Sequence, residues 1–176
     1  MIVESDMAEL HDFDIRNAKK MLQLLYILSA NVPFKPNLSQ LAEKSQIHRN
    51  TINSYLHFLE QGRLIRVLYA GGNSVATLQK PEKIYLDNTN IAYALSSKSP
   101  DKGNLRETFF LNQLATGHTV RYPQHGDFLV DDQWTFEVGG KNKSTRQIKD
   151  ISDSFLVDDT EYPISGIPLW LFGFLY

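Results

Sequence analysis

Apolar and polar residues alternate with the period of an α-helix through the first third of the chain. Apolar side chains recur there every three or four positions, which predicts helices. The predicted helices cover residues 15–30, 37–45 and 49–61. Asn37 or Ser39 can cap the second helix with its side-chain oxygen, and Gly62 suits the end of the third. The inward positions expected on the first helix are Ile15, Ala18, Leu22, Leu25, Tyr26 and Ser29.

Beyond Gly62 the pattern changes to that of β-strands. Residues that favour strands occupy 64–69 and 83–86, on either side of a loop that contains Gly71 and Gly72. A short helix is expected over 89–96. Three helices followed by two strands around a long loop are the element order of a winged helix-turn-helix domain.

The second half of the chain mixes helical and strand patterns. A helix is expected first, then three short strands, a polar helix and an apolar final strand. These elements cover residues 105–116, 119–122, 126–130, 134–138, 146–156 and 167–176. The polar stretch 97–102 is the expected domain boundary. The chain then divides into an acidic connector (1–14), a winged helix-turn-helix domain (15–97) and an α/β domain (98–176).

Charge is distributed unevenly along a chain whose net charge is only −2. Residues 1–15 hold five acids and no Lys or Arg, residues 16–83 hold ten Lys and Arg against three acids, and residues 84–176 hold eight against twelve. The basic middle segment coincides with the predicted helix-turn-helix. A basic block inside a nearly neutral chain indicates a local contact with a polyanion.

The third predicted helix begins with polar side chains that can contact DNA. In a helix-turn-helix, the second helix of the motif meets base edges and phosphates through its N-terminal turn. Arg and Asn make bidentate contacts to guanine and adenine, and Thr and Ser contact phosphates. The apolar and small residues that set the angle between the two helices are Leu38, Leu41, Ala42 and Ile47. The predicted DNA-binding residues are His48, Arg49, Asn50, Thr51, Asn53 and Ser54.

Two acids face each other in the predicted hairpin of the second domain. If the turn is formed by residues 131–133, Val130 pairs with Trp134 and Asp127 pairs with Glu137. Directly opposed side chains lie on one face of a sheet, about 5 Å apart at Cβ. Two carboxylates at that spacing repel each other unless a proton or a cation joins them, and Mg²⁺ is the natural cation for oxygen ligands.

A third acid and a lysine complete this candidate metal site. Glu107, on the preceding helix, can add a carboxylate, so the candidate metal ligands are Asp127, Glu137 and Glu107. Along an extended strand, Glu137, Gly139 and Lys141 share one face. Lys141 is therefore the candidate catalytic residue, because a lysine beside a metal-bound water stabilises charge in phosphodiester hydrolysis.

Five blocks of sequence together resemble the C-terminal half of a prokaryotic AAA+ ATPase family. The blocks are residues 38–42, 50–60, 83–88, 106–114 and 127–138. In that family a P-loop ATPase core precedes a winged helix and a domain of unknown function that resembles PD-(D/E)-x-K nucleases. The resemblance covers essentially residues 15–176 and implies that the chain is a fragment without the ATPase core. It identifies Asp127 and Glu137, with Glu107, as the nuclease-like acids. Gly139 stands where the lysine of the motif is expected, which indicates a degenerate, non-catalytic site.

The predicted fold class is therefore α+β: a winged helix-turn-helix followed by a small α/β restriction-endonuclease-like domain with a central mixed sheet. Three functions remain open. The first is a DNA-binding module of an AAA+ ATPase, with double-stranded DNA and its own ATPase core as partners. The second is a Mg²⁺- or Mn²⁺-dependent nuclease. The third is a protein-interaction module that docks on the ATPase core or on another partner, which the uncharged loop at 71–75 favours.

Composition argues against several other functions. The chain has no cysteine, which rules out disulfides, thiol nucleophiles and cysteine zinc sites. Its five His residues show no metal-ligand spacing, and there is no Walker A motif, so this chain should not hydrolyse ATP by itself. The apolar run 167–176 is too short to span a bilayer as a helix, and no signal-peptide pattern is present. We therefore expect a cytoplasmic protein that does not contact membranes.

Overall fold

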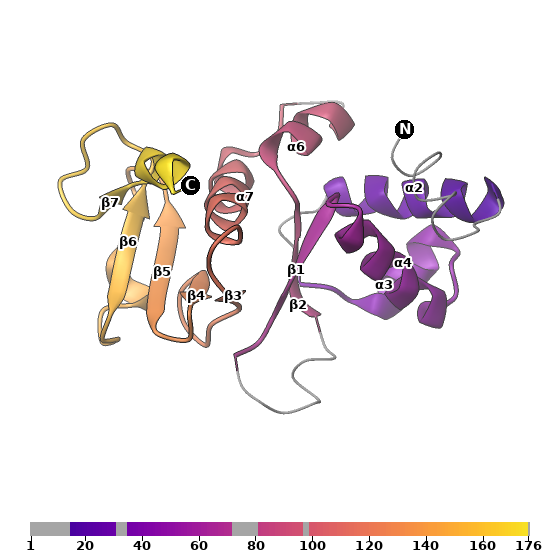
Figure 1. Cartoon of the computed structure of the whole chain (residues 1–176), viewed down its shortest axis with the longest axis horizontal. Helices are drawn as coiled ribbons and strands as arrows, with labels where there is room; N and C mark the ends of the chain where they lie inside the picture. Colours follow the sequence, from indigo (N-terminus) through magenta and orange to yellow (C-terminus); the bar gives the residue numbers. More distant parts are fainter. Residues whose placement is uncertain (1–14, 31–34, 72–80, 97–98, 176) are drawn as a thin grey trace. The chain divides into compact units, whose positions relative to one another are not determined.

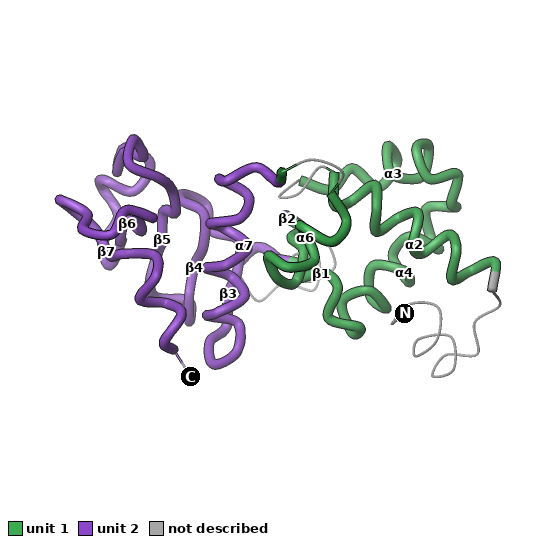
Figure 2. The backbone as a smooth tube through the Cα atoms, turned by 90° about the horizontal axis from the view of Figure 1, so that it is seen from above, with its two compact units in different colours: residues 1–67, 84–99 green, residues 68–83, 100–176 purple. Residues whose placement is uncertain are grey.

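The structure is a computed structural model that describes residues 15–30, 35–71, 81–96 and 99–175. The chain forms two compact units, unit 1 (residues 1–67 and 84–99) and unit 2 (residues 68–83 and 100–176), coloured separately in Figure 2. The predicted connector 1–14 and the middle of the predicted loop after Gly71 lie outside the described residues. No helix of the described ranges has the length and apolar character needed to cross a bilayer.

Unit 1 contains the predicted helices in the predicted order. The elements it holds wholly or in part are α2 (Ile15–Ser29), α3 (Leu38–Ser45), α4 (Arg49–Gln61), β1 (Ile65–Tyr69), β2 (Pro81–Leu86) and α6 (Thr89–Leu95). Strands β1 and β2 form a two-stranded sheet, and each continues into unit 2. All of these elements were predicted, with ends within two residues of those observed, because the capping and turn residues are local signals.

The caps of these helices follow the sequence with one exception. The side chain of Asn37 caps α3 by accepting the N–H groups of Ser39 and Gln40, each at 3.1 Å. Gly62 ends α4, and its N–H donates to the carbonyl of Phe58 at 2.9 Å. The left-handed residue of this turn, however, is Arg63, with φ 55°, and not the glycine.

The buried face of α2 differs from the predicted one. The side chains buried on it are Ala18, Met21, Leu24, Leu25 and Leu28. Leu22 is only half-buried and Tyr26 is 53% exposed. Because α2 carries apolar residues on more than one face, its sequence allows two inward stripes, and packing against α3 and α4 selects between them.

Unit 2 is built on a five-stranded mixed sheet. Its further elements are α7 (Lys102–Leu114), β3 (Val120–Arg121), β4 (Phe128–Val130), β5 (Trp134–Gly139), the 3₁₀ helix η1 (Thr145–Gln147), β6 (Ser154–Asp158), β7 (Ile167–Pro168) and the 3₁₀ helix η2 (Leu169–Phe174). The strand order is β3-β4-β5-β6-β7, with antiparallel pairing from β3 to β5 and parallel pairing from β5 to β7. The α+β class and the central mixed sheet are confirmed (Figure 1).

Two predicted elements of unit 2 are wrong. The polar helix expected over 146–156 is only the short η1 followed by β6. Its residues could continue a helix locally, but Ser154–Asp158 pair in parallel with β5, and sheet pairing overrides local propensity. The expected final strand 167–176 is a two-residue β7 followed by η2, because Phe172 turns inward and is buried.

A cluster of phenylalanines fixes α7 against the sheet. Phe110, fully buried, has its ring centroid 5.1 Å from those of Phe128 and Phe136 and 4.7 Å from that of Phe172. Aromatic pairs at this spacing stabilise the folded state by more than the burial of their apolar surface alone. Residues three apart on a helix lie on one face, so this packing carries Glu107 to the side of α7 that meets the sheet.

Candidate functional site

The helices α3 and α4 form a helix-turn-helix within unit 1. Leu41 on α3 and Ile47 in the turn are each 3% exposed, so they pack inward as predicted. Gln46 takes the left-handed conformation, φ 55°, that reverses the chain between the two helices. The Tyr55 hydroxyl donates to Asn17 Oδ1 at 3.1 Å and ties α4 to α2, and burial raises the pKa of this tyrosine.

The two faces of α4 differ in chemistry. Its apolar face is buried and consists of Ile52, Tyr55, Leu56 and Leu59. Five of the six predicted DNA-binding side chains are exposed, and Thr51 is intermediate; the exposed ones are His48, Arg49, Asn50, Asn53 and Ser54. His48 also caps the helix, because its Nδ1 accepts the N–H of Asn50 at 3.4 Å. The predicted residues thus lie together on the outward N-terminal turn of α4.

Exposed cations surround this helix-turn-helix on its neighbouring elements. The exposed Lys and Arg residues of α2, α3 and the segment before α3 are Arg16, Lys19, Lys20, Lys35 and Lys44. The N-terminus of a helix also carries a partial positive charge from its unpaired N–H groups. Five of the ten Lys and Arg residues of the basic segment 16–83 are therefore exposed on these elements of unit 1.

The predicted hairpin register is present, since Val130 pairs with Trp134 and Phe128 with Phe136. Asp127 lies just before β4 and is not one of the paired residues of the ladder, and its side chain reaches β5 through a hydrogen bond of its own. Asp127 Oδ2 accepts the N–H of Val138 at 2.9 Å, which orients this carboxylate toward β5. Glu137 is completely buried.

Gly126 makes this close approach of Asp127 to β5 possible. Its φ of +81° is a conformation that other residues rarely adopt, and an ideal Cβ there would lie 3.1 Å from the carbonyl oxygen of Phe136. Asp127 donates its own N–H to that same carbonyl at 2.8 Å.

Lys143, and not Lys141, provides the ammonium group at the two acids. Its Nζ lies 2.9 Å from Glu137 Oε1 and 3.2 Å from Asp127 Oδ2. Lys141 follows the end of β5, is exposed, and has no interaction with either acid in the described part of the chain. The strand geometry expected to carry Lys141 onto the acids stops at Gly139, so that prediction is corrected.

The third predicted acid is held by a second lysine. Lys83 Nζ lies 2.7 Å from Glu107 Oε2 and 4.0 Å from Asp127 Oδ1. Asp127 thus stands between the two ammonium groups. We call Glu107, Asp127, Glu137, Lys83 and Lys143 the acid–lysine cluster. As the side chains stand, no three acidic or His groups among the described residues converge in the way metal ligands do.

The environment shifts the pKa values of the two most buried members of the cluster. Burial raises the pKa of Glu137 above its ordinary value, the charges of Asp127 and Glu107 add to the rise, and Lys143 opposes it. For Lys143 burial alone would lower the pKa, but contact with Glu137 and the charge of Asp127 outweigh it, so its pKa is raised. Lys143 is therefore a firmly held cation at neutral pH.

A second charged pair borders the cluster. The guanidinium of Arg106, next to Glu107 on α7, pairs with Asp159, which follows β6. A Cβ at Gly140 would lie 2.8 Å from a guanidinium nitrogen of Arg106, so the glycine leaves room for that side chain. Sequence reasoning missed Lys83, Lys143 and Arg106. Their partners Glu107, Asp127 and Asp159 lie 24, 16 and 53 residues away in the chain, and Lys143 reaches the nearer Glu137 only because the loop after β5 folds back.

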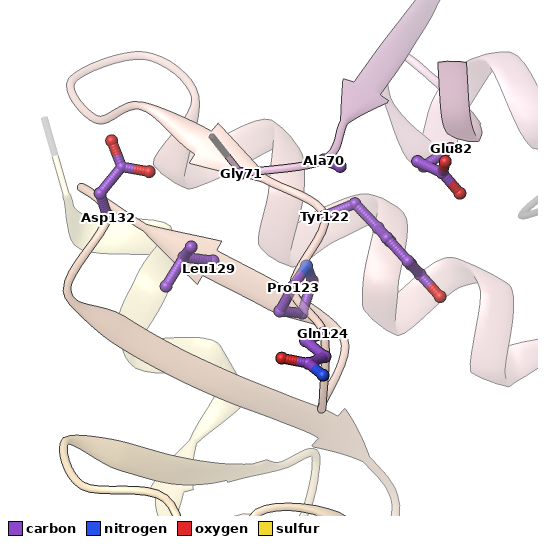
Figure 3. A pocket seen from close by; sticks show the side chains of 8 residues that line it. All are labelled: Ala70, Gly71, Glu82, Tyr122, Pro123, Gln124, Leu129 and Asp132. Atoms are coloured by element: carbon purple, nitrogen blue, oxygen red, sulfur yellow. The ribbon is translucent and has the colours of Figure 1, made fainter. Parts of the chain in front are cut away.

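A separate open hollow lies where the end of β1 meets the sheet of unit 2 (Figure 3). The N–H of Tyr122 donates to the carbonyl of Tyr69 at 2.8 Å, which joins the end of β1 to the end of β3. The hollow is lined by Ala70, Gly71, Glu82, Tyr122, Pro123, Gln124, Leu129 and Asp132. None of these lining residues is basic, so the hollow offers no side-chain cation to a phosphate.

Fold and site together define an α+β protein with a helix-turn-helix unit and a mixed-sheet unit that carries a buried acid–lysine cluster. The chain belongs to the family described as a domain of unknown function (DUF8612), which matches residues 1–102. The match covers the helix-turn-helix, β1, β2 and α6. No curated protein and no solved structure matches the chain.

Proposed function

We propose that this protein is a DNA-binding module that reads double-stranded DNA with the N-terminal turn of α4. The observation that carries the proposal is the outward polar turn of α4, where Arg49, Asn50 and Asn53 are exposed while the opposite face of the helix is buried. Arg and Asn are the side chains best suited to guanine and adenine edges in the major groove.

The surrounding charge supports the same function. Lys19 and Lys20 on α2 and Lys44 on α3 are exposed, and lysine side chains of this kind contact phosphates. Phosphate contacts of this kind supply much of the affinity and make it sensitive to salt. The resemblance of the sequence to AAA+ ATPase C-terminal regions supports a role beside an ATPase core in the cytoplasm, with an acid–lysine cluster that is not catalytic.

Fluorescence anisotropy with a short labelled duplex, at two salt concentrations, tests the proposal. Binding should weaken steeply as salt rises. Arg49→Ala combined with Asn50→Ala should reduce the affinity by at least about tenfold, the loss expected for one good base contact. Arg146→Ala is the matched control, because it removes a charge from an exposed position of unit 2.

An unchanged affinity in the Arg49 and Asn50 variant, with duplex binding intact, would exclude α4 as the reading helix. Absence of binding by the wild-type protein at low salt would exclude the function itself.

A second candidate function is protein docking through the C-terminal end of unit 2. The large apolar side chains exposed there are Trp170, Leu171, Phe174 and Leu175, which are 47%, 42%, 67% and 45% exposed. Contiguous exposed aromatic groups are typical of interaction surfaces. A Trp170→Ala, Phe174→Ala variant should abolish concentration-dependent association in light scattering, whereas a wild-type protein that stays monomeric at high concentration argues against self-docking.

A further inference from the structure

Large apolar side chains gather at the surface of the C-terminal end of unit 2. In η2, a 3₁₀ helix with three residues per turn, Leu171 and Phe174 share one face, and the ring centroid of Trp170 lies 6.2 Å from that of Phe174. The loop between β6 and β7 adds Tyr162 and Ile164, which are 82% and 107% exposed. We call these five residues the C-terminal patch. Single exposed apolar residues are common, whereas a group of this kind marks a surface that another molecule covers.

The backbone that presents the C-terminal patch is anchored. The indole N–H of Trp170 donates to the carbonyl of Glu161 at 3.3 Å, which joins the β6–β7 loop to η2. Phe172, which stands between the exposed residues of η2, is buried, and its ring centroid lies 4.7 Å from that of Phe110 on α7. A partner therefore meets a preformed surface and pays little entropy to order it.

The charge around the C-terminal patch is negative. Residues 150–176 contain five acids and no Lys or Arg. Glu161, whose carbonyl accepts the Trp170 indole N–H, is exposed, and Asp159 on the same loop pairs with Arg106 of α7. A local excess of acids repels nucleic acids and anionic lipid surfaces. The patch is instead complementary to an apolar protein surface that carries cations.

Helices α2 and α6 of unit 1 carry a surface with these properties. Among the described residues outside 155–175, the exposed large apolar side chains are Tyr26 on α2 and Tyr93 on α6, which are 53% and 60% exposed. The two helices pack against each other, and no residue of α6 is buried. Arg16, Lys19 and Lys20 are exposed on α2, and neither helix contains an acid. Positions 16, 19, 20 and 26 follow the spacing of one helix face, so these cations and Tyr26 share the outward side of α2.

We propose that the C-terminal patch of one copy of this chain docks on the α2–α6 surface of a second copy. The side chains of the patch pack on Tyr26 and Tyr93, and Glu161 faces the ammonium groups of Lys19 and Lys20. This inference rests on the second candidate function, docking through the C-terminal end of unit 2, and names its partner; it does not depend on DNA binding by α4. Because each copy carries both surfaces, a twofold dimer makes the same contact twice.

Sedimentation equilibrium of the full chain tests both sides of the contact. Trp170→Ala on the patch and Tyr26→Ser on α2 should each weaken self-association at least about tenfold, as truncation of a central aromatic side chain does in other interfaces. The two variants lie on different units, so a common effect links the two surfaces. Lys44→Glu is the matched control for α2, because it changes an exposed lysine of unit 1 on α3. It should leave association unchanged, and circular dichroism confirms that each variant is folded.

Charge reversal tests whether these two surfaces meet each other. Glu161→Lys should weaken self-association at least about fivefold, and so should Lys19→Glu combined with Lys20→Glu, because each places like charges opposite one another. An equimolar mixture of the two variants should associate as wild type does, since both contacts of the mixed dimer again join opposite charges. A mixture no stronger than its components overturns the proposed pairing.

The remaining outcomes separate the partner from the docking function. If Trp170→Ala dissociates while the Tyr26 and α2 charge variants associate as wild type does, the patch docks on another surface and the α2–α6 partner is wrong. A wild-type protein that stays monomeric at high concentration, as it would if its own two units held each other, overturns the inference. Duplex binding is measured separately by anisotropy, so neither result bears on the DNA-binding function.

Discussion

The side chain of Lys143 fills the space that a side chain at position 139 would need. An ideal Cβ on Gly139 would lie only 2.6 Å from Lys143 Cδ. Gly139, which stands where the sequence resemblance led us to expect a lysine, is therefore the residue that allows Lys143 from the next loop to reach Asp127 and Glu137.

This relationship predicts that Gly139→Ala is destabilising. Backbone strain is not the cause, because Gly139 does not have a positive φ; the new methyl group must instead displace Lys143. Overpacking of this kind costs about 1–3 kcal/mol. Chemical denaturation measures the loss. Gly117→Ala is the control, since nothing lies within 4 Å of its Cβ position.

A double-mutant cycle tests whether the clash with Lys143 causes the loss of stability in Gly139→Ala. In a Lys143→Gly background the same Gly139→Ala change should cost far less than in wild type, because the side chain that it strikes is gone. Equal costs in the two backgrounds would show that position 139 is sensitive for another reason.

The raised pKa of Glu137 predicts how stability depends on pH. Burial disfavours the charged form, so the folded state takes up a proton at a higher pH than the unfolded chain does. The resulting loss of folding free energy is fully present above the pKa of the folded state and disappears below the ordinary glutamate pKa of 4.5. The stability of wild type relative to Glu137→Gln should therefore rise as pH falls through this window. Urea unfolding of both proteins at several pH values measures this difference in unfolding free energy. If wild type instead loses stability relative to Glu137→Gln as the pH falls, burial does not raise the pKa of Glu137.

Local signals predict unit 1 well and unit 2 less completely. Asn37 marks the start of α3 and Ile47 the turn before α4, because caps and turns act over a few residues. The hairpin register from Val130 to Trp134 is equally local, since Asp131 and Asp132 both adopt positive φ in the turn.

The remaining features depend on contacts between distant parts of the chain. Strand β6 forms because β5 lies beside it, which no pattern within 146–156 reveals. Lys83 reaches Glu107 across 24 residues, and Lys143 reaches Asp127 across 16. The acids of the candidate site could thus be predicted from strand spacing, whereas the cations that neutralise them could not.

A buried ion pair in unit 1 gives a further prediction. Arg66 Nε lies 2.9 Å from Asp87 Oδ1, and the two side chains are 16% and 9% exposed. Burial lowers the pKa of Arg66, and the charge of Asp87 opposes this effect. Asp87→Ala should destabilise the protein by about 2–4 kcal/mol, because it leaves a largely buried guanidinium without its carboxylate. Adding Arg66→Ala to Asp87→Ala should destabilise the protein little further. If thermal unfolding shows that the double variant loses the sum of the two single losses of stability, the two residues are not coupled.

The helix-turn-helix separates the residues that build α3 from those proposed to contact DNA, so stability and affinity should respond to different substitutions. Asn37→Ala removes the cap of α3 and should lower stability by about 1 kcal/mol while leaving duplex affinity unchanged well below Tm. Arg49→Ala should lower the duplex affinity and leave stability unchanged, since its side chain is exposed.

The salt dependence of the remaining duplex binding by Arg49→Ala then shows which part of the DNA Arg49 contacts. If Arg49 contacts a phosphate, the slope of the logarithm of the binding constant against the logarithm of the salt concentration should become shallower by about one unit. If Arg49 contacts a base edge, this slope should stay unchanged and the protein should discriminate less between DNA sequences. A loss of affinity in Asn37→Ala as large as that in Arg49→Ala would mean that the protein does not bind DNA through this turn of α4.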